Sequence, residues 1–283
     1  MDLIDNKTIL TPTSGFLGES YSHSLNPYSG CSFAGTLCGH YCYVQHNRYI
    51  TKGREWQLYG VKKNAITAYV RDYTKWRNKR TPKPLNIYMA SSTDPYIPQE
   101  KKQSITRGLL EQMISYPPDV LWVQTRSPLV LRDKDLFLEL ARKTTLFITM
   151  TVETDKVSIE GLNKHSFSPQ KRFEAIRQLK NAGLPTKITA SPLMPLDSME
   201  VFVEQIDQSC HRVIFDHYLL GDGSEGKRTK RLPLPDILAA QGYDQWLELD
   251  TFYEVVQYAT SIMGADRVRI SKEGFNDLEP ITP

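Results

Sequence analysis

Three of the four cysteines lie within twelve residues of one another, at Cys31, Cys38 and Cys42. In a chain expected to stay in a reducing compartment, such clustering indicates metal binding more than a disulfide. Three thiolates suit a zinc ion, with His23, His40 or His46 as a fourth ligand, or a 4Fe–4S cluster. In a 4Fe–4S cluster held by three cysteines, one iron lacks a thiolate ligand. That open iron could bind the amino and carboxylate groups of S-adenosyl-L-methionine (SAM).

The fourth cysteine, Cys210, follows a segment with helical periodicity that ends near residue 208. A free cysteine at such a helix end is most often a small buried side chain. We therefore expect Cys210 in the core, although it could in principle be a fourth ligand. With one cysteine outside the triplet, a second cluster is not expected.

Short β-branched or aromatic runs alternate with segments of helical period from about residue 85 onward, which is typical of βα units. The predicted strands are residues 21–28, 85–90, 120–125, 146–151, 186–191 and 213–220. The predicted helices are residues 60–80, 99–115, 129–143, 169–182 and 198–208. The pattern therefore predicts an α/β fold, a partial (β/α)6 TIM-like barrel with a C-terminal helical extension. We expect one domain over residues 1–283, with its core at about 15–220 and the extension at about 221–283.

Polar residues follow four of these predicted strands, at 91–94, 125–127, 149–153 and 191–195. In a parallel β/α barrel the carboxyl ends of the strands carry the chemistry, because the loops there vary while the other end maintains packing. The sequence therefore predicts that polar groups gather at one rim of the barrel.

Bulk composition excludes few classes of function. The 35 basic and 32 acidic residues leave a formal net charge of +3, which permits a nucleic-acid partner without indicating one. No run of 18 apolar residues is present, so no membrane partner is expected. The first residues lack a basic start followed by an apolar stretch, so we expect a cytoplasmic protein.

Several segments together resemble one family. The run Asn26-Pro27-Tyr28-x-Gly30-Cys31, with residues 41–43, resembles the cysteine motif of radical SAM proteins related to spore photoproduct lyase. Residues 92–96 and 125–133 resemble that family's second and third strand motifs, and residues 168–185 resemble its fourth helix and turn. The resemblance covers about residues 15–220.

Two departures from the family pattern matter. The family spacing is C-x3-C-x2-C, whereas this chain has C-x6-C-x3-C, so the cysteine loop must be larger. We expect Gly35 and Gly39 to supply unusual backbone angles in that loop. The DNA-repair member of the family carries a hydrogen-donating cysteine where this chain has Ser92. Because a serine O–H bond is much stronger than a thiol S–H bond, we do not expect photoproduct repair.

The resemblance implies a reaction and its cofactors. A 4Fe–4S cluster on Cys31, Cys38 and Cys42 would reductively cleave SAM to give a 5′-deoxyadenosyl radical, which abstracts hydrogen from a substrate. The cofactor supplies this chemistry, and the protein positions the reacting carbon and excludes water. We expect a small-molecule substrate and an electron donor of the flavodoxin or ferredoxin type. The alternatives are a nucleic-acid- or peptide-modifying radical enzyme and a non-catalytic zinc- or cluster-binding protein.

The same resemblance implies roles for residues at the rim. Asp94, with Ser92 or Thr93, would bind the methionyl ammonium of SAM, and Arg126 would bind its carboxylate. The alternatives are a solvated turn aspartate and a surface salt bridge.

Further rim residues would contact the nucleoside. Thr151 or Glu153 would bond the ribose, the segment with Ser191, Leu193 and Met194 would line the adenine, and Tyr43 would lie near it. Each could instead end a strand or pack in the core.

The last predicted strand offers candidate catalytic residues, Asp216, His217 and Tyr218, because alternate side chains of a strand face opposite sides. A satisfied core histidine is the more frequent outcome for His217. The basic run 227–231 could meet an acidic substrate group, although a solvated loop is the more common outcome. Aromatic and basic residues also interleave over residues 56–77, which we interpret as a core face with a charged back.

Overall fold

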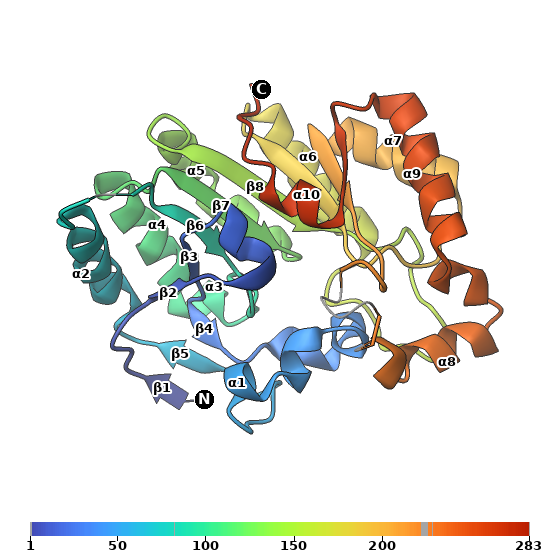
Figure 1. The fold of residues 1–283 in the computed structure, drawn as a ribbon, viewed down its shortest axis with the longest axis horizontal. Coiled ribbons are helices and arrows are strands. Elements are labelled where there is room, and N and C mark those ends of the chain that lie inside the picture. Colours follow the sequence, from blue (N-terminus) through green and yellow to red (C-terminus); the bar gives the residue numbers. More distant parts are fainter. Residues whose placement is uncertain (1, 82, 222–225, 228, 283) are drawn as a thin grey trace.

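The computed structural model describes residues 2–81, 83–221, 226–227 and 229–282. These residues form a mixed α/β fold with ten α-helices and a sheet that is mostly parallel (Figure 1). The main sheet has eight strands in the order β11-β10-β9-β8-β7-β6-β3-β2. All neighbouring pairs are parallel except β2 with β3, which is antiparallel.

Each of the six predicted strands contributes to this sheet. Its strands are β2 (Leu10–Pro12), β3 (His23–Leu25), β6 (Asn86–Met89), β7 (Val120–Thr125), β8 (Thr145–Thr151), β9 (Thr186–Ala190), β10 (Arg212–Phe215) and β11 (Val268–Ile270). Across the described residues the hydrogen-bonded order ends at β2 and β11, so a closed barrel is not formed.

The predicted strand 21–28 is divided between two sheets. After β3 the chain passes Pro27, which has no N–H to donate to a ladder, and then forms β4 (Tyr28–Ser29). A separate three-stranded sheet has the order β1 (Asp2–Ile4), β5 (Gly60–Lys62) and β4. The predicted helix 60–80 is therefore wrong at its start, because residues 60–62 pair with β1 and β4.

The five predicted helices are found with changed bounds, and further helices form outside the predicted ranges. They are α1 (Arg48–Thr51), α2 (Ala65–Arg77), α3 (Glu100–Gln103), α4 (Ile105–Ser115), α5 (Lys134–Leu140), α6 (Pro169–Asn181), α7 (Met199–Ser209), α8 (Leu234–Ala240), α9 (Leu249–Met263) and α10 (Ser271–Asn276). The predicted helix 99–115 breaks at Ser104, whose φ is +53°. The predicted helix 129–143 begins as the 3-10 helix η5 (Pro128–Asp133). Helix α6 is confirmed, with Ser168 as its cap and Gly183 at φ +77° after its end.

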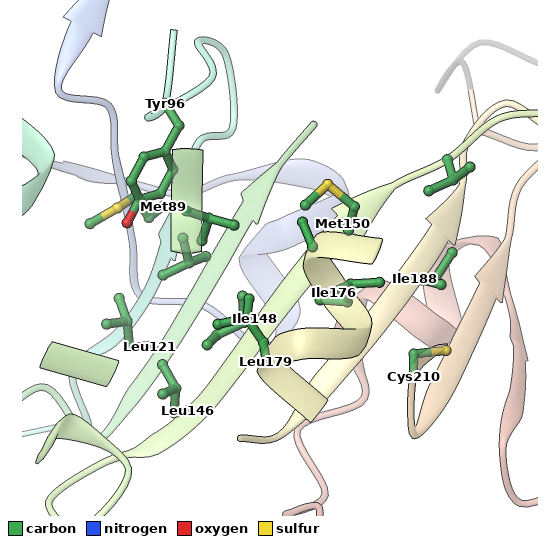
Figure 2. Close-up of a cluster of buried hydrophobic side chains, with 14 of the residues drawn as sticks. Met89, Tyr96, Leu121, Leu146, Ile148, Met150, Ile176, Leu179, Ile188 and Cys210 are labelled. Atoms are coloured by element: carbon green, nitrogen blue, oxygen red, sulfur yellow. The ribbon is translucent and has the colours of Figure 1, made fainter. Parts of the chain in front are cut away.

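Alternate residues of the strands serve two different cores. Leu121 and Ile148 pack with the helices, and Figure 2 shows Ile176 and Leu179 of α6 lying over Ile148. Trp122 lies between Leu121 and Val123 in β7 but belongs to an aromatic cluster on the opposite face of the sheet. Its members are Tyr21, Tyr88, Val120, Trp122, Phe147, Ile214 and Phe275.

The C-terminal extension is not only helical as predicted. It contains β11, which pairs with β10 and extends the main sheet by one strand. Phe275 of α10 then completes the aromatic cluster on the sheet face away from α6. The last residues therefore take part in the core of the same fold. Within the described chain, no helix has both the length and the apolar character needed to cross a membrane.

Candidate active site

A pocket of about 690 Å³ lies where the cysteine loop meets the carboxyl ends of the parallel strands. Most of the predicted site residues line it together. They are Cys31, Cys38, Cys42, Tyr43, Ser92, Thr93, Asp94, Arg126, Thr151, Ser191, Asp216, His217 and Tyr218. The volume is in the usual range of small-molecule sites. Residues from Cys31 to Tyr218 are thus brought to one cavity.

The cysteine loop is built from three short 3-10 helices, η2 (Ser32–Gly35), η3 (Leu37–His40) and η4 (Tyr43–His46). The prediction that Gly35 and Gly39 supply unusual backbone angles is wrong, because neither residue has a positive φ. Gly39 is required by close approach, since a Cβ there would lie 1.8 Å from the carbonyl oxygen of Ala34. The positive φ falls at Gly30, at +76°. The loop is therefore folded tightly on itself around its three cysteines.

The three thiols differ in their electrostatics. Cys38 shares a hydrogen bond with Cys42 and accepts another, 2.9 Å long, from Nη1 of Arg126. The bond with Cys42 and the charge of Arg126 lower the pKa of Cys38 to about 7, against the effect of burial. Burial and then the neighbouring Cys38 raise the pKa of Cys31 to about 12. Cys38 is therefore the thiol most ready to act as a thiolate ligand.

Two of the three histidines considered as zinc ligands have other contacts. The His23 ring packs edge-on against Trp76, and Nε2 of His40 accepts a 3.1 Å hydrogen bond from the backbone of Asn163. His46 lines the outer part of the pocket. Over the part of the chain that the structure describes, no three His, Cys, Asp or Glu side chains are grouped so as to hold one metal ion.

Asp94 joins the ends of two neighbouring strands. Its carboxylate accepts hydrogen bonds from the Thr125 hydroxyl at 2.7 Å and from the backbone N–H of Arg126 at 2.8 Å. Burial raises the pKa of Asp94, and these donors oppose that rise. Asn26 supports the same turn, because its Oδ1 accepts the backbone N–H groups of residues 92 and 93. Much of the hydrogen-bonding capacity of Asp94 is therefore used inside the protein.

Glu153 does not line the pocket but lies behind Arg126. Its carboxylate pairs with Nη2 of Arg126 at 3.2 Å, and it also contacts Nη1 of Arg172 and the hydroxyl of Tyr41. Burial alone would raise the pKa of Glu153, but the two arginines override it and hold the pKa well below the usual range. Glu153 is thus a buried anion between the buried Arg172 and the partly buried Arg126.

Asp216, His217 and Tyr218 lie beyond the end of β10, so the predicted strand 213–220 is too long. Asp216 accepts a 3.0 Å hydrogen bond from the Ser191 hydroxyl and a 3.1 Å hydrogen bond from the backbone N–H of His217. Nε2 of His217 lies 3.3 Å from the carbonyl oxygen of Trp246, and burial lowers the pKa of His217. These residues form the pocket wall nearest the C-terminal segments.

Some predicted residues lie outside the pocket lining. Leu193 and Met194 are buried behind the rim, where their backbone N–H groups bond to carbonyls of residues 216 and 153. Cys210 is fully buried in the core (Figure 2), and its Sγ donates to the carbonyl of Ile206. In the basic run 227–231, Arg228 lies outside the described residues, while Arg231 lines the pocket.

Other pocket residues were missed by the sequence analysis. Gln124 faces the pocket from β7, and its Nε2 donates to the Thr151 hydroxyl at 3.1 Å. A glutamine inside an otherwise apolar strand was a signal that could have found it. Tyr41 and Arg172 act through Glu153, and only the fold brings them to it. Arg48 and the highly exposed Tyr49 extend the pocket at its mouth.

Three buried polar atoms of pocket residues have no hydrogen-bond partner within the described chain. They are Oγ1 of Thr93, Nε of Arg126 and the hydroxyl of Tyr218. Neighbouring atoms cover all three from solvent, so they do not form the surface of the open cavity. The cavity itself is lined by three thiols together with hydroxyl and carboxylate side chains, a set of groups that suits a sulfur-ligated cluster beside a polar ligand.

Comparison with known proteins finds relatives and one similar solved structure. No family model matches the chain. It is 28% identical over 205 residues to an uncharacterized protein of Acidianus two-tailed virus, covering 68% of this chain and 63% of the relative. It is 29% identical over 179 residues to an uncharacterized protein of Methanocaldococcus jannaschii, covering 60% of each. A Mycobacterium tuberculosis relative, also uncharacterized, is 22% identical over 196 residues, which is 67% of this chain and 54% of that protein.

The chain thus spans about 60% of the length of the curated relatives it matches. The similar solved structure is a cysteine-to-serine mutant of spore photoproduct lyase, with a TM-score of 0.60 and 14% identity. The match covers 95% of this chain and 81% of the lyase chain. The parallel-dominated α/β fold described above is therefore similar to that of spore photoproduct lyase.

Proposed function

We propose that this chain is a radical SAM enzyme. The observation that carries the proposal is the lining of the pocket, where three thiols from one loop share a cavity with polar residues from the carboxyl ends of the parallel strands. Cys31, Cys38 and Cys42 would hold a 4Fe–4S cluster, in which each thiolate binds a different iron. When bound, the cluster and SAM supply hydrogen-atom abstraction by a 5′-deoxyadenosyl radical.

The fold supports the same proposal. Six parallel strands, β3 and β6 to β10, lie side by side in the main sheet, and helices follow most of them along the chain. We take this arrangement as a partial (β/α)6 barrel, open between its edge strands. The pocket lies at the carboxyl ends of the strands, where such folds carry their chemistry.

The chain's own residues would bind and orient SAM. Ser92 and Thr93 line the pocket after β6, and we assign them to the amino-acid end of SAM. Asp94 lies beside them and holds the turn. Because Glu153 is enclosed by Arg126, Arg172 and Tyr41, we assign ribose contacts to Thr151 or Ser191, which line the cavity.

The substrate in this proposal is a small or medium-sized metabolite. A cavity of about 690 Å³ accommodates SAM and leaves limited space for a second molecule. Asp216, His217 and Tyr218, which line the cavity from the segment after β10, are the candidates for contacting it. Ser92 stands where the repair enzyme has its thiol, so photoproduct repair is not proposed. A one-electron donor of the flavodoxin or ferredoxin type would reduce the cluster.

The proposal is tested with anaerobically purified protein reconstituted with iron and sulfide. We expect about four irons per chain, an iron–sulfur absorption spectrum, and 5′-deoxyadenosine after dithionite and SAM are added. Cys31→Ala and Cys42→Ala should lose the cluster, and the buried Cys210→Ala should keep it. A zinc-loaded wild type that assembles no cluster and does not cleave SAM would overturn the proposal. Salt-sensitive binding of DNA or RNA by the reconstituted protein would favour a nucleic-acid substrate instead of a metabolite.

A further inference from the structure

The guanidinium of Arg126 contacts the sulfur of a predicted cluster ligand. Nη1 lies 2.9 Å from Sγ of Cys38, while the backbone N–H of Arg126 is held by Asp94 at 2.8 Å. The side chain leaves the end of β7 and reaches across the pocket to the cysteine loop, 88 residues earlier in the sequence. A strand end is thus connected directly to one thiol.

Glu153 and Arg172 set the orientation of the Arg126 guanidinium. Glu153 pairs with Nη2 of Arg126 through Oε1, and its other oxygen contacts Arg172. Nη1 of Arg172 in turn donates to the backbone carbonyl of Thr151 at 2.7 Å, and both Glu153 and Arg172 are almost completely buried. Charged groups that are buried and paired on both sides have little freedom to move. Arg126 is therefore held in the position that meets Cys38.

The described contacts of Arg126 use part of its guanidinium. Nη1 and Nη2 each donate one hydrogen bond, to Cys38 and to Glu153 respectively, out of the five N–H groups of the fork. Only Nε is without a described partner. The main contacts of Arg126 are thus with the thiol and its supporting carboxylate.

A cation that donates a hydrogen bond to a thiolate ligand favours the more negative state of a cluster. Hydrogen bonds to the sulfurs and local charge are two of the protein's means of setting iron–sulfur potentials. Cys38 is buried, so the interaction is weakly screened by solvent. Reduction adds one negative charge close to the guanidinium.

We infer that Arg126 is a positioning residue for Cys38 that raises the reduction potential of the cluster, and that Glu153 and Arg172 hold it in place. This inference rests on the proposed function, because it requires a cluster on the cysteines. It assigns to Glu153 a supporting role behind Arg126 in place of a contact with the cofactor.

The test measures the midpoint potential of the reconstituted cluster by EPR-monitored redox titration without SAM. We expect Arg126→Gln to lower the equilibrium constant for one-electron reduction about tenfold, which corresponds to about 59 mV. Arg126→Lys keeps the charge but cannot bridge Cys38 and Glu153, so its potential should lie between the two. Arg177→Gln is the matched control, since Arg177 is bonded to Ser209 outside the pocket and its loss should leave the potential unchanged.

Two outcomes would overturn the inference. One is an Arg126→Gln potential equal to that of the wild type, together with weaker SAM binding, which would make Arg126 a carboxylate-binding residue. The other is a wild-type potential in Arg126→Lys, which decides the matter even where the glutamine variant does not fold. Failure of the wild type to assemble any cluster would instead reject the proposed function.

Discussion

Nζ of Lys187 on β9 donates a 2.7 Å hydrogen bond to the backbone carbonyl of Asp277, 90 residues later in the chain. The Lys187 side chain is 1% exposed and lies over the rings of Trp122 and Phe147, at 4.5 and 4.3 Å from their centroids. The Asp277 carboxylate also pairs with two arginines of β10 and β11. The segment after α10 is thereby tied to the aromatic cluster on one face of the sheet.

The burial of Lys187 predicts a pH-dependent stability. Burial lowers the pKa of Lys187 to about 7, although Asp277 opposes the shift. The folded protein therefore releases this proton near pH 7, whereas the unfolded chain keeps it until about pH 10. Because the unfolded state binds more protons in this window, the free energy of unfolding rises with pH, by about 2 kcal/mol between pH 6.5 and 8.5.

Urea unfolding of the wild type and of Lys187→Met at these two pH values checks this prediction. The variant has no titrating group at the site, and Asp277 keeps Arg212 and Arg269 as partners. We expect the free energy of unfolding of the wild type, relative to that of Lys187→Met, to be higher at pH 8.5 than at pH 6.5. The same pH dependence in both proteins would show that another group is responsible.

Much of the rim could be predicted because parallel strands align their carboxyl ends. Short apolar runs predict the strands, and the rim residues follow them in the sequence. Most of the residues after β6, β7, β8, β9 and β10 that were predicted in this way line one cavity. What each rim residue contacts could not be predicted in the same way. Glu153 looked like a free carboxylate after a strand, and only the fold brings Arg126 and Arg172 to either side of it.

The errors in the fold have a common physical origin. β11 is three residues long and β5 is three residues long, too short for a periodic pattern, and both depend on distant partner strands. The turn at Ser104 depends on a left-handed backbone conformation, which a serine in the sequence does not predict. Tertiary pairing decided these segments over local propensity.

Removing Arg172 should be strongly destabilising. Arg172→Met leaves Glu153 buried with one of its two cationic partners missing, so we expect a loss of about 3 kcal/mol in the free energy of unfolding. Adding Glu153→Gln should recover part of this loss, because the amide is neutral. Arg177→Met on the same helix should cost less than about 1 kcal/mol. Denaturant unfolding of the wild type, Arg172→Met, Glu153→Gln and the double variant measures the coupling, and strictly additive effects would contradict it.

Ala90 adopts a backbone conformation that suits glycine. It follows β6 at the pocket with a φ of +84°, and its N–H is held by the carbonyl of Leu25. Ala90→Gly should therefore raise the free energy of unfolding by about 1 kcal/mol. In contrast, Ala68→Gly in the interior of α2 should lower it by about 1 kcal/mol. A destabilised Ala90→Gly variant in thermal or urea unfolding would show that the side chain contributes more than the backbone strain costs.

The enlarged cysteine loop makes unequal demands on its two inner glycines. A Cβ on Gly39 would lie 1.8 Å from the carbonyl oxygen of Ala34, whereas a Cβ on Gly35 would be at an ordinary 3.6 Å from the Gln57 side chain. Gly39 adjoins Cys38, so Gly39→Ala must displace the backbone next to that thiol. We expect Gly39→Ala to reduce the iron bound after reconstitution several-fold, and Gly35→Ala to bind as much iron as the wild type. Iron and sulfide assays on the two variants, with circular dichroism to confirm folding, compare them directly. Equal iron contents would mean that the loop accommodates the methyl group without moving Cys38.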